Sequence, residues 1–131
     1  MSDAVEARTR RAERVRLAAA AIGVVLALIG VRFLLWPDAA SRFFGIGARP
    51  AGAELQYVVA LRDLWLGGLA IGLAMLRAWQ GLALWLGLGA LVCFGDAGIV
   101  AAAAGPALAI AFHMVSGVVC AGLAWGAWRL G

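Results

Sequence analysis

The chain has 131 residues, of which 65% are hydrophobic and 14% are charged. Soluble globular domains are about 45–50% apolar, so this composition excludes an ordinary water-soluble domain and indicates a membrane protein. All eleven basic residues are Arg, and the formal net charge is +4. Five of the Arg lie in the first sixteen residues, with no basic face or aromatic platform elsewhere. The charge therefore indicates membrane orientation, and nucleic-acid binding is not expected.

Residues 1–16 form a basic arm, which we expect to be a cytoplasmic helical extension of the first membrane span. That span covers about residues 17–36 and carries one charge, Arg32. Its apolar region exceeds the roughly 7–15 residues of a cleaved signal peptide, so we expect an uncleaved helix. Trp36 marks the membrane interface, and Pro37 ends the span.

A short interfacial helix is predicted after the first span. Pro37 and Asp38 begin it, and Gly45 ends it. Its two aromatic residues, Phe43 and Phe44, are expected to dip into the lipid boundary. The following loop, which contains Gly47, Pro50 and Gly52, is expected to be irregular.

Three further spans are predicted, at about residues 55–76, 81–104 and 107–128, separated by turns at residues 77–80 and at Gly105-Pro106. The fold class is therefore all-α: a polytopic membrane protein with a single four-helix transmembrane up-down bundle over residues 17–131. A GxxxG match, Gly68 to Gly72, is attributed to packing within the chain. Stripes of small residues let membrane helices approach closely. They are Gly23, Ala27 and Gly30; Gly67, Ala70 and Ala74; and Gly117, Ala121 and Ala124.

Arg placement predicts the orientation. With a cytoplasmic N-terminus, seven Arg lie on the inner side, whereas only Arg42 and Arg49 lie in outer loops. Cytoplasmic segments of membrane proteins are enriched in basic residues. We therefore expect a bacterial inner-membrane protein with both termini in the cytoplasm.

Five ionisable residues interrupt the spans: Arg32, Arg62, Asp63, Asp96 and His113. Counting about 1.5 Å per residue along helices of alternating direction places all five in one layer of the outer half. The predicted pairing joins Arg62 to Asp96 and His113, and Asp63 to Arg32. Adjacent residues point about 100° apart on a helix, so Arg62 and Asp63 are expected to serve different neighbours.

Two interpretations of this layer remain open. A closed ion network would fix the register of the helices. Alternatively, the layer lines an outward-facing pocket in which Arg anchors an anionic or amphipathic ligand and Asp96 with His113 forms a proton-sensitive pair. A relay or conduction role is a third, weaker alternative.

Cofactor sites find little support. Cys93 and Cys120 have no metal-ligand spacing and are interpreted as small buried hydrophobes. A zinc site would need Cys93, Asp96 and His113 to converge and still lacks a fourth ligand. A single His excludes a two-His haem site within the chain. Ser116, three residues after His113, does not make a catalytic triad. We expect no metal and no cofactor.

Several short motifs resemble an uncharacterised family of small bacterial four-helix membrane proteins, known only as a domain of unknown function. The matching features are Arg32 and Pro37, Phe44-Gly45, Leu61-Arg62-Asp63 with the following glycines, Gly95-Asp96, and His113. More distantly, the layout is similar to DoxX-like membrane proteins, some of which are associated with quinone-linked oxidation. The resemblance implies a fold and a membrane location, and it implies no activity.

The leading functional hypothesis is a non-enzymatic binding or interaction module in the membrane. The expected partners are the lipid bilayer and a small anionic or amphipathic ligand, and no oligomeric state is predicted. One rival is a small transporter, either proton-coupled or anion-recognising. The other is a quinone-linked redox protein or accessory subunit.

Overall fold

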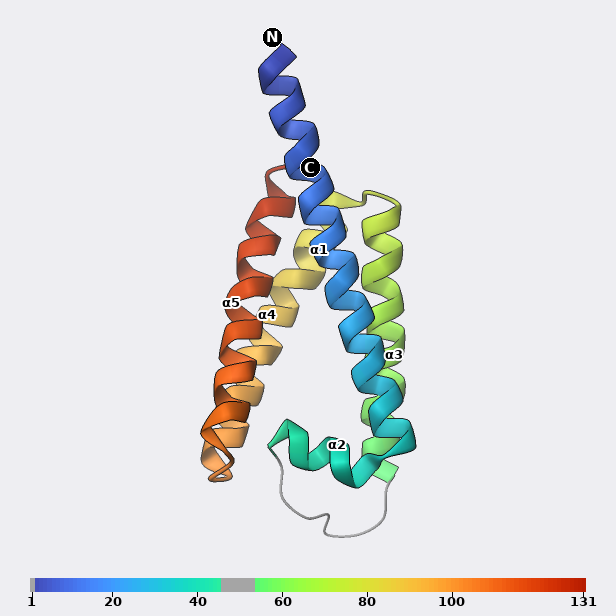
Figure 1. Cartoon of the computed structure of the whole chain (residues 1–131), viewed down its shortest axis with the longest axis vertical. Helices are drawn as coiled ribbons and strands as arrows, with labels where there is room; N and C mark the ends of the chain where they lie inside the picture. Colours follow the sequence, from blue (N-terminus) through green and yellow to red (C-terminus); the bar gives the residue numbers. More distant parts are fainter. Residues whose placement is uncertain (1, 46–53) are drawn as a thin grey trace.

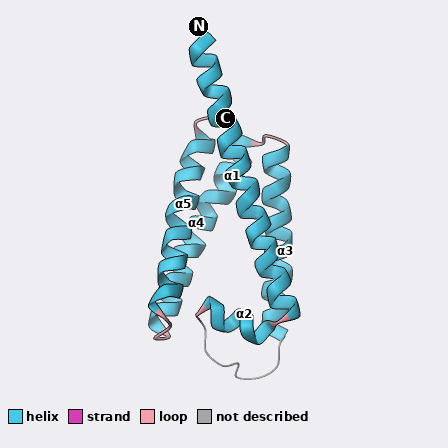
Figure 2. Ribbon diagram, viewed as in Figure 1, coloured by secondary structure: helices cyan, strands magenta, loops and turns pink. Residues whose placement is uncertain are grey.

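The computed structural model describes residues 2–45 and 54–131, and this part of the chain is helical without any strand. The helices are α1 (Ser2–Leu35), α2 (Pro37–Phe44), α3 (Glu54–Met75), α4 (Trp79–Ala102) and α5 (Ala107–Trp128). Figure 2 shows short turns between α1 and α2 and between the last three helices. The expected irregular loop with Gly47, Pro50 and Gly52 lies outside the described residues.

Four helices, α1, α3, α4 and α5, are long and apolar enough to cross a membrane. The 22 residues of α3 or α5 correspond to about 33 Å at 1.5 Å per residue, which matches the hydrocarbon thickness of about 30 Å. Leu84, Leu91 and Leu108 are exposed on the outside of the bundle, as lipid-facing side chains are. Length and composition thus indicate a multi-pass membrane protein, and the all-helical prediction is confirmed.

The basic arm is the first part of α1, which projects beyond the other helices (Figure 1). Two ion pairs stabilise it, each between residues one helical turn apart: Glu6 with Arg10, at 2.8 Å, and Glu13 with Arg16. A guanidinium nitrogen of Arg8 donates a 3.5 Å hydrogen bond to the carbonyl oxygen of Leu130. The N-terminal arm and the C-terminus therefore share one end of the bundle, which we call the terminal end.

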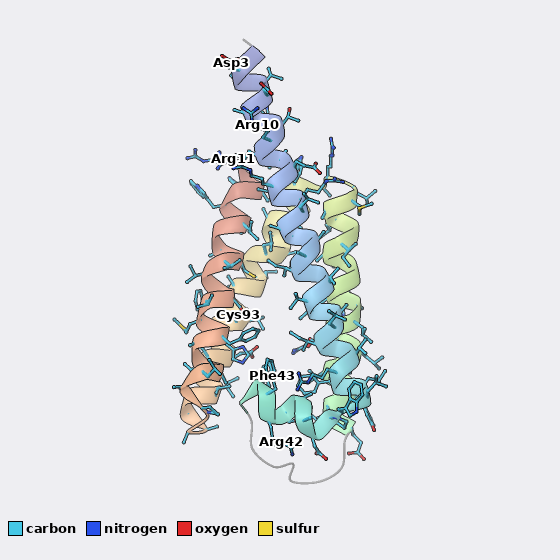
Figure 3. All side chains as sticks on the ribbon, viewed as in Figure 1. Asp3, Arg10, Arg11, Arg42, Phe43 and Cys93 are labelled. Carbon is cyan, nitrogen blue, oxygen red and sulfur yellow. The ribbon has the colours of Figure 1, made fainter. Side chains whose placement is uncertain are left out.

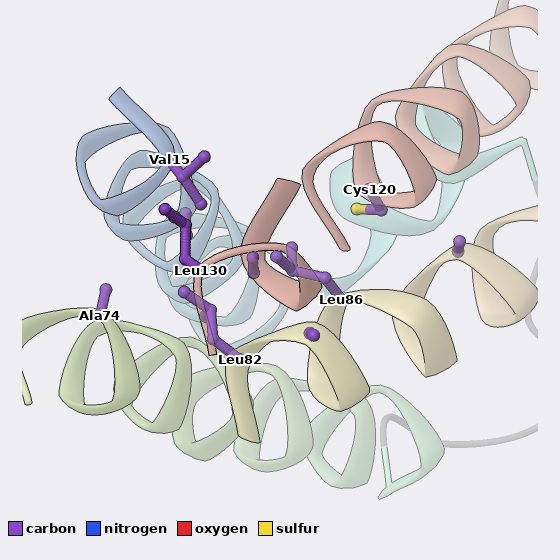
Figure 4. Close-up of a cluster of buried hydrophobic side chains, with 10 residues drawn as sticks. Val15, Ala74, Leu82, Leu86, Cys120 and Leu130 are labelled. Atoms are coloured by element: carbon purple, nitrogen blue, oxygen red, sulfur yellow. The ribbon is translucent and has the colours of Figure 1, made fainter. Parts of the chain in front are cut away.

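The long helices form two antiparallel pairs, α1 with α3 and α4 with α5, in an up-down arrangement (Figure 1). The pairs meet near the terminal end and diverge toward α2. All four helices contribute to the largest buried cluster, at the terminal end (Figure 4). Its members are Val15, Ala19, Ala74, Leu82, Ala83, Leu86, Ala90, Cys120, Ala127 and Leu130. The apolar core therefore holds the pairs together at one end only.

Glycine sets the close approach of α1 and α3. A Cβ at Gly67 would lie 2.5 Å from the carbonyl oxygen of Gly23, and a Cβ at Gly30 would lie 2.8 Å from that of Ala60. Real Cβ atoms do not come so close to backbone oxygens, so any side chain at these positions would force the helices apart. The expectation that small residues make this interface is confirmed.

Three other small residues, Gly68, Gly72 and Ala121, do not lie at helix interfaces as the sequence predicts. Within the described chain, no atom of another element lies within 4 Å of a Cβ built on Gly68 or Gly72, so the prediction that this GxxxG match packs within the chain is wrong. Ala121 is exposed on α5, whereas Gly117 is buried. The reason is the rotation of each helix about its axis. Helix α3 turns the face of Gly67 toward α1, and the next residue, Gly68, points about 100° away from it.

We expect Gly67→Ala to reduce the free energy of unfolding by about 1–3 kcal/mol, because the added methyl group must push two backbones apart. Gly68→Ala is the matched control, one residue away in open space, and should leave the stability unchanged or raise it slightly. Both can be measured by SDS titration in mixed micelles followed by circular dichroism. Equal losses for the two variants would contradict this account of the interface.

Candidate functional site

Helix α2 crosses the end of the bundle opposite the termini (Figures 1 and 2). Pro37 occupies its first turn, and Gly45 ends it with a left-handed φ of 97°. A Cβ at Gly45 would lie 2.7 Å from Val100 and 2.8 Å from Ala109. Helix α2 therefore starts at the end of α1, and its C-terminal cap, Gly45, packs on the α4–α5 hairpin, so that α2 bridges the two pairs. The short helix predicted at this position is confirmed.

His113 holds the far end of α2. Its Nε2 atom lies 3.2 Å from the carbonyl oxygen of Phe44, so the Nε2–H tautomer donates a hydrogen bond to it. The two rings also meet edge to face with centroids 4.4 Å apart. On its other side the Phe44 ring packs against Phe33 of α1 at 6.2 Å. Phe44 thus points into the protein, which corrects its predicted place at the lipid boundary.

Arg62 and Asp63 pair with each other. The Nε atom of Arg62 lies 3.1 Å from Oδ1 of Asp63, whose side chain is 5% exposed, whereas that of Arg62 is 48% exposed. The prediction that they serve different neighbours is therefore wrong. Although their Cβ atoms point about 100° apart, the long Arg side chain folds back along α3 and reaches the neighbouring carboxylate.

Asp96 joins α4 to this region electrostatically. The half-buried carboxylate interacts with His113 of α5 and with Arg62 of α3, and it also repels Asp63. Among the described residues it makes no ion pair within 4 Å. Three helices thus bring Arg62, Asp63, Asp96 and His113 within electrostatic range of one another, but only one contact among them is a direct ion pair.

Arg32 has a different neighbour from the one expected. Its guanidinium carbon lies 4.8 Å from the ring centroid of Phe43, a cation–π contact. No carboxylate in the described parts of the chain lies within ion-pair distance of it, so the predicted pairing with Asp63 is wrong. Phe43 in turn contacts Phe112 of α5, with centroids 6.0 Å apart. The sequence predicts Phe43 in the short helix, but the spacing of the residues gives no sign of its contacts with Arg32 and Phe112.

A groove of about 350 Å³ lies beside Arg32. Its lining comes from the outer end of α1 and from the start of α2: Leu28, Val31, Arg32, Trp36 and Ala39. Figure 3 shows Phe43 on the bundle side of α2 and Arg42 on the opposite side. The groove offers one cation and an apolar wall. In the part of the chain that the structure describes, no three His, Cys, Asp or Glu side chains gather as a metal site requires.

We expect His113→Leu to reduce the stability of α2 packing by about 1–3 kcal/mol, because the carbonyl of Phe44 loses its hydrogen-bond donor. Hydrogen–deuterium exchange should then be faster in peptides covering α2 and unchanged in α3. Ser116→Ala is the matched control, since the Ser116 hydroxyl donates only to Phe112 within its own helix. Unchanged exchange in α2 for His113→Leu would show that the hydrogen bond does not hold this helix.

A protein family matches most of the chain. Residues 23–129 match the family described as Domain of unknown function (DUF4267). The match includes all five of the predicted site residues and leaves the basic arm outside. No curated protein and no solved structure matches the chain. Because the match covers most of its length, the chain belongs to the family of domain of unknown function DUF4267.

Proposed function

We propose that this protein is a non-enzymatic binding module of the bacterial inner membrane that takes a small amphipathic anion in the groove beside Arg32. The observation that carries the proposal is the position of the Arg32 guanidinium and its lack of an ion-pair partner in the described part of the chain. Its guanidinium lines the groove and stacks on Phe43, and no ion pair within 4 Å joins it to a carboxylate among the described residues. A charge at membrane depth requires a counter-charge, and an anionic ligand supplies one.

The ion pairs favour binding over a structural network. A network that fixes helix register needs charged pairs between helices. The described ion pair of the layer, Arg62 with Asp63, lies within α3. The α1–α3 register is held instead by Gly23 and Gly67. The charges are therefore not needed to align these helices, which supports a role toward a ligand.

The lining defines the chemistry of the ligand. Arg32 suits a carboxylate or phosphate group, because a guanidinium forms charge-assisted hydrogen bonds with both. Leu28, Val31 and Trp36 suit an apolar chain. The volume of about 350 Å³ falls within the range of about 300–1,000 Å³ for small-molecule sites. The lining holds no nucleophile and no general base, so the proposal is one of binding without catalysis.

The test uses oleate as an amphipathic anion and oleyl alcohol as its uncharged analogue, added to the protein in phosphatidylcholine nanodiscs. We expect oleate to bind more tightly than the alcohol. Loss of a charge-assisted bond, worth about 1.5–3 kcal/mol, should weaken oleate binding to Arg32→Gln by roughly ten- to hundredfold. Affinity can be followed by native mass spectrometry.

Arg42→Gln is the matched control, because Arg42 is exposed on the opposite side of α2 (Figure 3). It should bind oleate like the unchanged protein. Equal affinity for oleate and oleyl alcohol, or equal effects of the two substitutions, would refute anion recognition at Arg32.

The proposed orientation places both termini in the cytoplasm. Seven Arg lie toward the terminal end and two in the segment between the first two spans. The Arg8–Leu130 hydrogen bond supports a common side for the two termini. Fusions after Gly131 test this. A green fluorescent protein fusion should fluoresce and an alkaline phosphatase fusion should be inactive. Active phosphatase with no fluorescence would reverse the topology.

A further inference from the structure

The two cysteines of the chain meet across the α4–α5 interface. They are the only cysteines among the 131 residues and lie on different helices. Cys93 is half-buried, and Cys120 is 7% exposed at the edge of the buried cluster (Figure 4). Their thiols lie near enough to influence each other electrostatically. Figure 3 shows Cys93 on α4 where this helix runs beside α5.

The local packing explains how the thiols come within reach. Helices α4 and α5 form an antiparallel hairpin, and Phe94, next to Cys93, lies over Gly117, one turn before Cys120. A Cβ at Gly117 would be 2.6 Å from the Phe94 ring. The missing side chain lets the helices approach closely at this level. A disulfide needs Cα atoms about 4.4–6.8 Å apart, a separation that only closely packed helices reach.

We propose that Cys93 and Cys120 are a redox modification site at which a hydroperoxide converts two thiols into one intrachain disulfide. The first thiolate attacks one peroxide oxygen, the O–O bond breaks, and the leaving oxygen takes the thiol proton as water. The second thiol then attacks the sulfenic sulfur, the S–O bond breaks, and a second water leaves. Two thiols and one hydrogen peroxide thus give one disulfide and two waters.

The disulfide would join α4 to α5 directly below the polar residues. Asp96 lies three residues from Cys93 and interacts with it electrostatically. The disulfide would therefore restrain the position of α4, the helix that carries this carboxylate, relative to α5. The thiol pair belongs to α4 and α5, whereas the groove of Arg32 belongs to α1 and α2. The redox proposal therefore does not depend on the binding proposal, and either can fail alone.

The experiment uses the full chain, purified under reducing conditions and reconstituted in nanodiscs. One sample is treated with hydrogen peroxide, and both are denatured and alkylated with a maleimide. We expect two maleimides per untreated chain and none per oxidised chain, with full recovery after dithiothreitol. Peptide mapping should identify a cross-linked species that joins the peptides of Cys93 and Cys120, and it separates methionine oxidation from thiol loss.

The matched control is the double variant Val92→Cys with Cys93→Ser. It keeps two cysteines but turns one thiol about 100° around α4, onto an exposed position, and should form no intrachain cross-link. Two alkylated thiols after peroxide would overturn the proposal. So would cross-links between chains only, irreversible oxygen addition to sulfur, or cross-linking of the control as efficient as that of the unchanged protein.

Discussion

The close contact of backbones at Gly23 and Gly67 is the constraint on which the rest of the structure depends. In a membrane, burial of apolar surface does not drive helices together as it would in water. Small residues let α1 and α3 touch along their length, and Gly117 does the same for α4 and α5 by receiving Phe94. Each pair is thus a unit of its own, and the two units share a core only near the chain termini.

Because the pairs diverge toward α2, this short helix is the element that connects them at the other end. It is held by backbone and ring contacts: Gly45 against the α4–α5 hairpin, and the carbonyl and ring of Phe44 against His113. His113 therefore has a partner that charge counting could not reveal, a main-chain oxygen. Its position links the polar residues of α3 and α4 to the placement of α2 and hence of Phe43, on which Arg32 stacks.

The two proposals concern different halves of the molecule. The Arg32 groove is formed by α1 and α2, faces outward and is lined by one cation and an apolar wall. The thiol pair lies inside the α4–α5 hairpin and uses the close packing of that hairpin. Away from the core that the helices share at the terminal end, α2 and the electrostatic contacts of Asp96 connect the halves. A ligand at one and oxidation at the other would therefore influence each other through α2 or through this carboxylate.

The sequence by itself determined the number and extent of the long helices, the basic arm, and the short helix between Pro37 and Gly45. Hydropathy, helix-ending residues and a fixed rise per residue are properties of the chain alone. Only the tertiary structure decided which neighbour each side chain meets. That choice depends on how each helix is rotated about its axis, and one residue corresponds to about 100° of rotation. Arg62 therefore pairs with Asp63 along one helix, Gly68 and Gly72 face outward, and two cysteines far apart in the sequence share one interface.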